Sequence, residues 1–270
     1  MPRLPIVLLC LMIAPSAWAQ GQERIPSHCI ALANDIEGAR VIPAAFGDPL
    51  SEGRVRLSYV DHATFLLETP GGLVAATDYT GYLGAHEVLP DVVTMNNAHS
   101  SHWTGVPDER IPHVLQGWGE GDGPADYNLD LGEMLVRNVT TDARGMGSGI
   151  RANANSIFIF EVAGLCIGHL GHLHQIPSPE QYAMIGRLDV VMVPVDGGYT
   201  MRTDAMAEVV KRLRSSVIIP MHWFSGSSLN QFLEDMNGEF EVVRPEISSM
   251  EISLNDLPSQ PTIMVLLPEY

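Results

Sequence analysis

Residues 91–102 have the sequence DVVTMNNAHSSH, which combines a strand pattern with two histidines. Its first half, from Asp91 to Met95, is a short and mostly apolar run, which predicts a buried β-strand. Its second half carries His99 and His102 directly after that strand. Side chains that follow a strand lie at the rim of a sheet, where binding and catalytic sites are commonly assembled. The stretch therefore predicts a strand that brings two imidazoles to a site.

Two further segments repeat this arrangement. His169 and His172 follow the predicted strand 165–167, and His222 follows the predicted strand 216–220. Neutral imidazole is a good zinc ligand, and a catalytic zinc keeps one position for water. Such water ionises near neutral pH and becomes a nucleophile. Because a single histidine near a strand end is more often a surface or hydrogen-bonded residue, the prediction of a metal site depends on the three segments together.

The segments around these histidines predict a layered α/β domain. The early strands are hairpin-like, whereas the later ones alternate with helices, which indicates mixed sheets. Residues 117–123 and 139–154 contain several glycines and are expected to be loops. No linker is evident inside residues 51–270, so this part is expected to be one domain. The expected strands are 54–60, 63–68, 72–76, 91–95, 156–162, 165–167, 188–195 and 216–220, and the expected helices are 203–213 and 228–237.

The N-terminus has the pattern of a secretory signal peptide over residues 1–20. Arg3 precedes the apolar run 4–14, and Ala17-Trp18-Ala19 supplies the small residues that a signal peptidase recognises. The apolar run is too short to span a bilayer, and a membrane anchor is the alternative interpretation. We therefore expect a periplasmic or secreted protein without membrane contact after signal removal. Residues 21–50 are expected to form a lead-in to the domain.

The 270-residue chain is strongly acidic. Its formal net charge is −17, from 15 basic and 32 acidic residues, and Arg3 is the only charged residue within the predicted signal. Phosphate binding depends on Lys and Arg, so this charge argues against a nucleic-acid partner. A small-molecule substrate is the remaining expectation.

Two cysteines, Cys29 and Cys166, would remain after loss of Cys10 with the signal. They could pair in an oxidising compartment. Cys166 lies in an apolar run, however, which favours a buried core thiol over a disulfide.

Several segments resemble the metallo-β-lactamase superfamily in order and spacing. Residues 59–68 are similar to its first hairpin, 91–102 to its metal-binding loop His-x-His-x-Asp-His, 155–172 to the strand pair that leads to its His-x-Gly-Asp, and 217–222 to the strand of its final ligand. The similarity is greatest to lactonase-like and phosphodiesterase-like members. The resemblance implies an α/β (α+β) fold, an αββα sandwich of two mixed β-sheets flanked by helices, with the metals at one edge of both sheets.

This chain departs from the family pattern at three metal-site positions. Asn97 stands where the loop has its first histidine, Ser101 where it has aspartate, and His172 where an aspartate normally bridges two metals. The altered set favours a single ion, Zn or another divalent metal, held by three or four histidines. The predicted metal ligands are His99, His102, His169, His172 and His222.

The resemblance implies a metal-dependent hydrolase that cleaves a small ester, lactone, amide or phosphodiester through metal-bound hydroxide. His62 and Asp196 are the predicted catalytic residues, because they end segments that line the family's site; structural hydrogen bonding is the alternative for each. Asn97, Trp103 and Trp223 are the predicted substrate-binding residues, and packing in the core is the alternative for both tryptophans. The competing hypothesis is a protein that keeps the scaffold and binds a metal or ligand without efficient catalysis.

Overall fold

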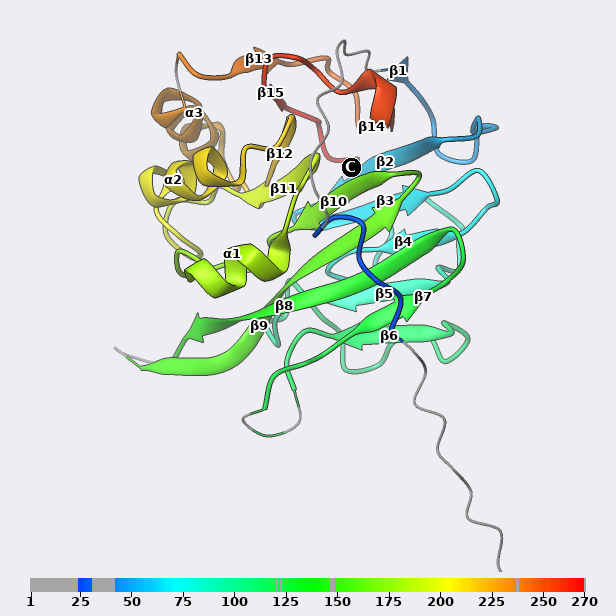
Figure 1. Ribbon diagram of the computed structural model, residues 1–270, viewed down its shortest axis with the longest axis horizontal. Coiled ribbons are helices and arrows are strands. Elements are labelled where there is room, and N and C mark those ends of the chain that lie inside the picture. The colour runs from blue at the N-terminus through cyan, green and yellow to red at the C-terminus, as the bar shows by residue number, and fades with distance from the viewer. Residues whose placement is uncertain are drawn as a thin grey trace, which may run out of the picture.

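Two mixed β-sheets pack face to face in the computed structural model, which describes residues 24–30, 42–119, 121, 123–145, 149–236 and 238–269 (Figure 1). The first sheet has the order β1 (Ile42–Pro43), β14 (Ser249–Ser253), β2 (Arg54–Asp61), β3 (Thr64–Glu68), β4 (Val74–Ala76), β5 (Val92–Met95) and β6 (His113–Gln116). The second has the order β13 (Glu241–Val243), β15 (Thr262–Met264), β12 (Val217–Met221), β11 (Val190–Pro194), β10 (Leu165–His169), β9 (Ile150–Val162), β8 (Met134–Arg144) and β7 (Asn128–Asp130). The predicted sandwich of two mixed sheets is confirmed.

Apolar side chains from both sheets fill the space between them. Leu57 and Phe65 from the first sheet and Phe158 and Phe160 from the second are among the fully buried members of this core. Each such side chain contributes roughly 1.5–3 kcal/mol when it is fully buried. The core therefore fixes the two sheets relative to each other, and with them the strand ends that carry the site.

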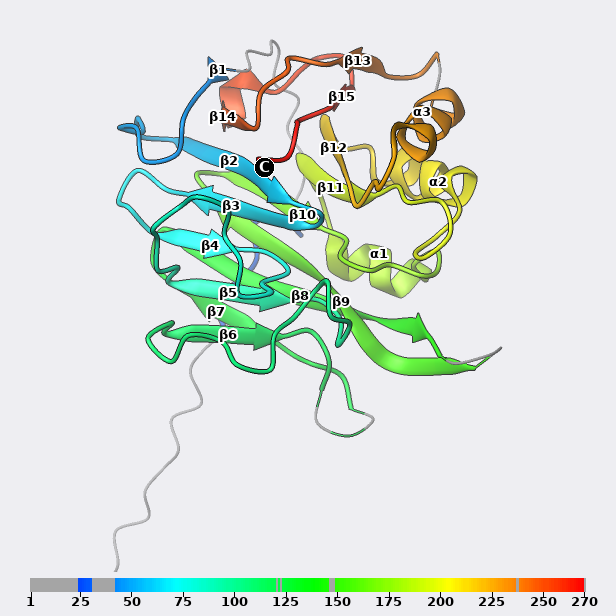
Figure 2. The ribbon, with the colours of Figure 1, turned by 180° about the vertical axis from the view of Figure 1, so that it is seen from behind.

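The helices of the described residues, α1 (Pro179–Ile185), α2 (Thr203–Leu213) and α3 (Gly226–Asp235), cover the outer face of the second sheet. β11 is buried along its whole length because the first sheet covers one of its faces and these helices cover the other. The outer face of the first sheet is covered by the segments that follow β4 and β5 (Figure 2). Helices therefore flank one side of the sandwich in the described part of the chain, which also contains no helix long and apolar enough to cross a membrane.

Residues 139–144 and 150–154, within a segment expected to be a loop, instead belong to β8 and β9, which pair in a long hairpin, so this prediction was wrong for them. The buried positions in this part of β8 are occupied by Val139, Thr141 and Ala143, whose neighbours are more exposed. Small and polar residues hide this period-two pattern from a search for apolar runs. The hairpin extends past the edge of the sheet (Figure 1).

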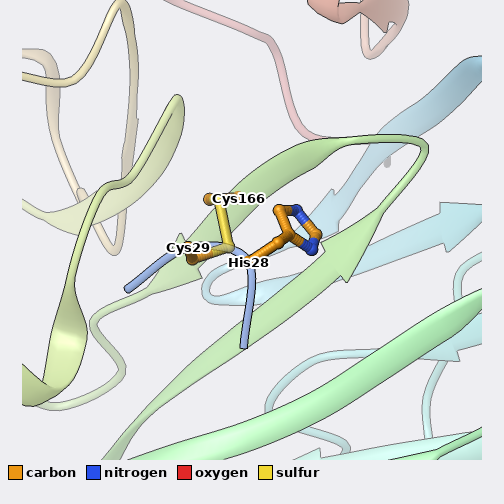
Figure 3. Close-up of side chains that lie close together, drawn as sticks. All are labelled: His28, Cys29 and Cys166. Carbon is orange, nitrogen blue, oxygen red and sulfur yellow. A yellow bond between two sulfur atoms is a disulfide. The ribbon is translucent and has the colours of Figure 1, made fainter. Parts of the chain in front are cut away.

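The N-terminal segment 24–30 is attached to the second sheet. Cys29 forms a disulfide with Cys166 of β10, with a Cα–Cα separation of 5.8 Å (Figure 3). The backbone N–H of His28 donates to Glu161 of β9 at 3.0 Å. The expectation of a buried free thiol at Cys166 was therefore wrong: the residue is fully buried, but it is bonded to Cys29. The predicted signal, residues 1–20, lies outside the described residues.

Candidate metal centre

Polar side chains from both sheets meet at one edge of the sandwich. The carboxyl ends of β2, β4 and β5 in the first sheet and of β10, β11 and β12 in the second point to this edge, since parallel strands end on the same side. Each strand is followed by at least one functional side chain. These are His62 after β2, Asp78 after β4, His99 and His102 after β5, His172 after β10, Asp196 after β11 and His222 after β12.

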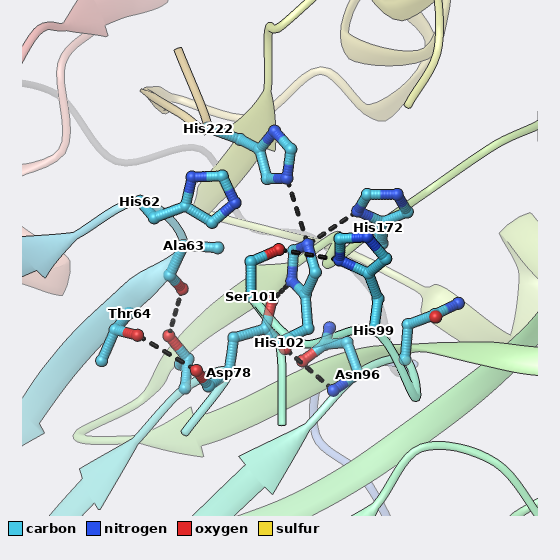
Figure 4. Close-up of polar contacts among 12 residues, drawn as sticks. His62, Ala63, Thr64, Asp78, Asn96, His99, Ser101, His102, His172 and His222 are labelled. Atoms are coloured by element: carbon cyan, nitrogen blue, oxygen red, sulfur yellow. Dashed lines mark hydrogen bonds and ion pairs between the residues drawn. The ribbon is translucent and has the colours of Figure 1, made fainter. Parts of the chain in front are cut away.

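His102 lies at the centre of the cluster (Figure 4). Its Nε2 is 3.1 Å from His222 Nε2 and 2.6 Å from His172 Nδ1. His62 joins the same group, because single nitrogens of His62, His102 and His222 all lie within 4.8 Å of one another. The His62 Nε2 atom is buried and has no hydrogen-bond partner among the described residues. Four imidazoles therefore converge on a small volume at the sheet edge.

Two buried carboxylates stand behind the cluster. Asp78 Oδ2 lies 2.5 Å from His102 Nδ1, and Asp196 Oδ2 lies 2.9 Å from His222 Nδ1. An ionised carboxylate only accepts hydrogen bonds, and a neutral imidazole has one donor and one acceptor nitrogen. When both carboxylates are ionised, the Nδ1 atom that faces each of them is the protonated one, which leaves the Nε2 atoms of both rings as acceptors that face each other.

The electrostatics of the cluster favour neutral rings. Burial, and next the neighbouring His222, hold the pKa of His102 well below its usual range and lower that of His62 to about 3. Burial and His102 likewise lower the pKa of His172. Burial raises the pKa of Asp78 to about 7. Several imidazoles packed this closely cannot all be charged, so they present lone pairs rather than protons at neutral pH.

This arrangement fits a divalent cation. In that protonation state the two Nε2 lone pairs face each other at 3.1 Å, an arrangement that a cation between them stabilises. Nitrogens bound to one tetrahedral zinc at about 2.0–2.1 Å lie about 3.3 Å apart, close to the separation of the His102 and His222 nitrogens. The shorter separation from His172 to His102 would widen slightly. Carboxylates that orient ligating imidazoles from behind, as Asp78 and Asp196 do here, are the usual support of such sites.

The backbone at this edge is held in an uncommon conformation. His62, Asp78 and His222 have positive φ angles of 48°, 42° and 60°, a region that costs free energy for residues other than glycine and that is concentrated at functional sites. The His222 N–H donates to the His62 carbonyl oxygen at 2.7 Å, which joins the loop after β2 to the end of β12. This bond links the two sheets at the site and keeps the imidazoles of His62 and His222 next to each other.

Gly171 permits the close approach of the loop that carries His172. Its φ is +58°, and a Cβ atom at this position would lie 2.1 Å from the Asn96 side-chain nitrogen. Asn96 in turn donates to the Ser156 carbonyl oxygen at 2.7 Å. Any larger residue at position 171 would therefore displace the loop and the imidazole it carries.

Comparison with known proteins agrees with this arrangement of strands and histidines. Residues 56–222, more than half of the chain, match the model of a family described as the Beta-lactamase superfamily domain. The chain belongs to the metallo-β-lactamase superfamily. A metal-dependent hydrolase of Methanoculleus marisnigri is 22% identical over 202 residues, which cover 69% of this chain and 89% of that protein. One of Pelotomaculum thermopropionicum is 22% identical over 223 residues, with 74% and 96% covered.

Solved structures show the same superfamily fold. A candidate Zn-dependent hydrolase of the metallo-β-lactamase superfamily from Thermotoga maritima has a TM-score of 0.56 and 25% identity, over 78% of this chain and 98% of that one. A metallo hydrolase from Ignicoccus hospitalis has a TM-score of 0.54 and 18% identity, over 80% and 97% of the two chains. The chain therefore spans nearly the whole length of these relatives.

Of the five predicted metal ligands, the structure brings together His102, His172 and His222. His99 is exposed at the rim, where its ring stacks on that of His172 and its Nδ1 lies 3.0 Å from Ser101 Oγ. His169 is not part of the cluster. Its Nε2 lies 2.8 Å from the Ala63 carbonyl oxygen and its Nδ1 lies 3.2 Å from Asn96 Nδ2.

The contacts of His169 correct its prediction as a metal ligand. The Ala63 carbonyl accepts the Nε2 proton, and the Asn96 amide faces the Nδ1 lone pair. Both nitrogens are thereby used in the interior, and the ring has none left for an ion. His169 is a structural residue that ties the first hairpin to the end of β10.

Asp196, predicted to be catalytic, lies behind His222, with its Oδ2 atom 2.9 Å from His222 Nδ1. Burial by itself would raise its pKa, but hydrogen bonds from His222, from Thr200 and from backbone N–H groups hold the pKa below its usual range. Its Oδ1 accepts from the N–H of Gly198 at 2.8 Å, and its Oδ2 accepts from Thr200 Oγ1 at 2.6 Å. A carboxylate so fully engaged orients His222 and has no free lone pair directed at a substrate.

Trp103 and Trp223, the two tryptophans predicted to bind substrate, do not line the cavity. Trp103 packs on the outer face of the first sheet, with its ring 5.6 Å from that of Trp118, and Trp223 packs against the core beneath the helices. The aromatic wall is formed instead by Tyr199 and Phe224, which sequence reasoning missed. Asp78, Arg144 and Arg151 were missed as well. Asn97 lines the cavity, and its amide donates to the Ala154 carbonyl oxygen at 2.8 Å, so its role toward a substrate stays a prediction.

Replacement of Asp196 by Asn is expected to lower zinc affinity by about 10- to 100-fold, because the neutral amide orients the His222 ring less firmly and makes it a weaker ligand. Competition with a chromophoric chelator measures the change. Asp204→Asn, an isosteric change on the exposed first turn of α2, is the matched control and should leave the affinity unaltered. Equal affinities of the two variants would contradict the assigned role of Asp196.

Proposed function

We propose that this protein is an exported metal-dependent hydrolase that acts on a small ester, lactone, amide or phosphodiester. The observation that carries the proposal is the convergence of His102, His172 and His222, backed by Asp78 and Asp196, at the base of an open cavity. The relatives named metal-dependent hydrolases support the reaction class. The acidic net charge of −17 supports a small-molecule substrate over a nucleic acid.

His102, His172 and His222 would hold a single ion, of which zinc is the best match to an all-imidazole set. When bound, such an ion polarises the oxygen under attack and lowers the pKa of a water molecule in contact with it. Asn97, Ser101 and His172 stand where the superfamily pattern has two further anionic ligands and a histidine. The loss of these contacts supports one ion rather than two.

We assign the proton transfer to His62. Its buried Nε2 has no partner among the described residues, and its ring centroid lies 3.8 Å from that of His222. The pKa of His62 is lowered to about 3, by burial and then by His222, so the neutral ring accepts a proton from attacking water at Nε2 only transiently. The same low pKa makes the protonated ring a strong acid toward the leaving group.

A binding protein without efficient catalysis is the second candidate function. It is favoured by one observation: the described residues that line the cavity include no carboxylate, so none of them can act as an acidic general base. The two functions share the metal site and differ only in turnover.

Activity and metal content of histidine variants separate these functions. Zinc-loaded protein is expected to hydrolyse at least one member of a panel of lactones, β-lactams and phosphodiesters, and His222→Ala should lose both the ion and the activity. His113→Ala, which removes an imidazole from β6 away from the cluster, is the matched control and should retain both. Activity that survives His222→Ala would overturn the proposal. Bound zinc without hydrolysis of any substrate would establish the binding function instead.

Export is a separate part of the proposal. It is supported by the signal-like pattern of residues 1–20 and by the Cys29–Cys166 disulfide, because disulfides persist in oxidising compartments. The full chain, expressed in a bacterium, is expected in the periplasmic or secreted fraction without its first ~20 residues. Mass spectrometry of the intact protein provides the test. A full-length product in the cytoplasm would contradict export.

A further inference from the structure

The cavity above the histidine cluster contains two arginines. Its volume is about 350 Å³, and its lining includes Arg144 and Arg151 from the β8–β9 hairpin, facing a wall that includes His172, His222 and Phe224. The superfamily pattern does not account for these arginines, and the chemistry assigned to the metal centre does not use them. Their presence raises the question of what they bind.

Charge pairing distinguishes these two residues from most other arginines of the described chain. Seven arginines form ion pairs with carboxylates at 2.6–3.3 Å, namely Arg24, Arg54, Arg56, Arg110, Arg137, Arg187 and Arg202. Within the described residues, neither Arg144 nor Arg151 has a carboxylate within ion-pair distance, although the chain carries 32 acidic residues. Two uncompensated positive charges in one cavity of a protein with net charge −17 form a local site of opposite sign.

Arg144 is held in place without being neutralised. Its Nη1 donates to the Gly198 carbonyl oxygen at 3.0 Å and its Nη2 donates to the Thr200 carbonyl oxygen at 2.7 Å. A guanidinium has five N–H donors in a fixed planar array, so these two bonds orient it and leave others for a ligand. The backbone N–H of Arg144 also donates to His174 Nδ1 at 2.7 Å. The hairpin is thus fixed to the loop that carries Tyr199.

The side chain of Arg151 is exposed and has no hydrogen-bond or ion-pair partner among the described residues. It lies opposite Ala143 in the register of the hairpin, one position from Arg144. Arginine is suited to carboxylate and phosphate groups, because its parallel N–H donors match their oxygens. A ligand that reaches both guanidiniums would therefore meet one preorganised and one free set of donors.

An aromatic pair lines the cavity beside the histidines. Tyr199 and Phe224 are 70% and 65% exposed, and their ring centroids lie 5.5 Å apart. Phe224 also contacts the cluster, with its ring centroid 5.1 Å from that of His62. Large exposed aromatic side chains at the mouth of a cavity commonly mark a contact surface for a ligand.

We propose that the substrate of this protein carries an anionic oxygen group, a carboxylate or a phosphate, that binds Arg144 and Arg151. An apolar part of the same molecule lies against Tyr199 and Phe224. This orientation directs the remaining end of the molecule toward His102, His172 and His222. The identity of the hydrolysed bond rests on the proposed function, but binding of the anion depends only on the arginines.

Calorimetric titration of the metal-free protein tests the inference separately from catalysis. The probes are benzoate, phenylphosphonate and the neutral benzamide, which share one ring and differ in charge. At least one anion is expected to bind about tenfold or more tightly than benzamide, because charged hydrogen bonds to a guanidinium are absent from the neutral probe. Tighter binding of benzoate would assign a carboxylate substrate, and tighter binding of phenylphosphonate a phosphate.

Variants identify the groups responsible. Arg151→Gln is expected to weaken anion binding about tenfold and to leave benzamide binding unchanged. Arg244→Gln, the same charge change beside β13 and outside the cavity, is the matched control and should bind both anions as the parent protein does. Arg144→Gln serves as a second variant, with its thermal unfolding midpoint measured to confirm an intact hairpin.

Three results would overturn the inference: no binding of either anion, equal binding of anions and benzamide, or anion affinities unaltered in both Arg151→Gln and Arg144→Gln. Each of these can occur in a protein whose zinc-loaded form hydrolyses neutral substrates. Conversely, anion binding that depends on the arginines can occur in a protein that never turns over. The failure of this inference and the failure of the proposed hydrolase are therefore distinguishable.

Discussion

The site depends on two ring nitrogens, His102 Nε2 and His222 Nε2, that face each other 3.1 Å apart. Asp78 and Asp196 lie on the Nδ1 sides of the same two rings and turn both Nε2 atoms toward a common point. Asp78 follows a strand of the first sheet and Asp196 follows a strand of the second, and the apolar core holds those sheets together. The folded core thus keeps in place a pair of imidazoles that a cation can bridge.

The sequence predicted most of the scaffold and the centre of this site. A continuous apolar run such as 188–195 predicts a strand that is buried on both faces. β11, which is buried along its whole length, confirms this prediction. Histidines that follow three such strands, His102, His172 and His222, do meet, because the ends of parallel strands share an edge. The order of these segments also indicated the superfamily, which the family match confirms.

The errors arise where side-chain direction or distant pairing decides the outcome. His169 is the last residue of β10, where successive side chains point to opposite faces, and it turns into the interior. Trp103 follows β5 in an irregular segment, and its ring packs on the outer face of the first sheet. Asp78 acts through a histidine 24 positions away, which no local pattern reveals. Likewise, Cys29 meets Cys166 across 137 residues. The β8–β9 hairpin was not predicted, because small and polar residues fill its buried positions. Arg144 and Arg151 lie in this hairpin, so their place in the cavity was not predicted either.

We propose that this edge of the sandwich binds one cation through three histidines that follow different strands. A crystal structure of zinc-loaded protein, with anomalous data collected on both sides of the zinc absorption edge, is the decisive test. A single strong anomalous peak is expected within bonding distance of His102 Nε2, His222 Nε2 and His172 Nδ1. Two peaks of comparable strength, a peak bound by His169, or no peak at the cluster would contradict it.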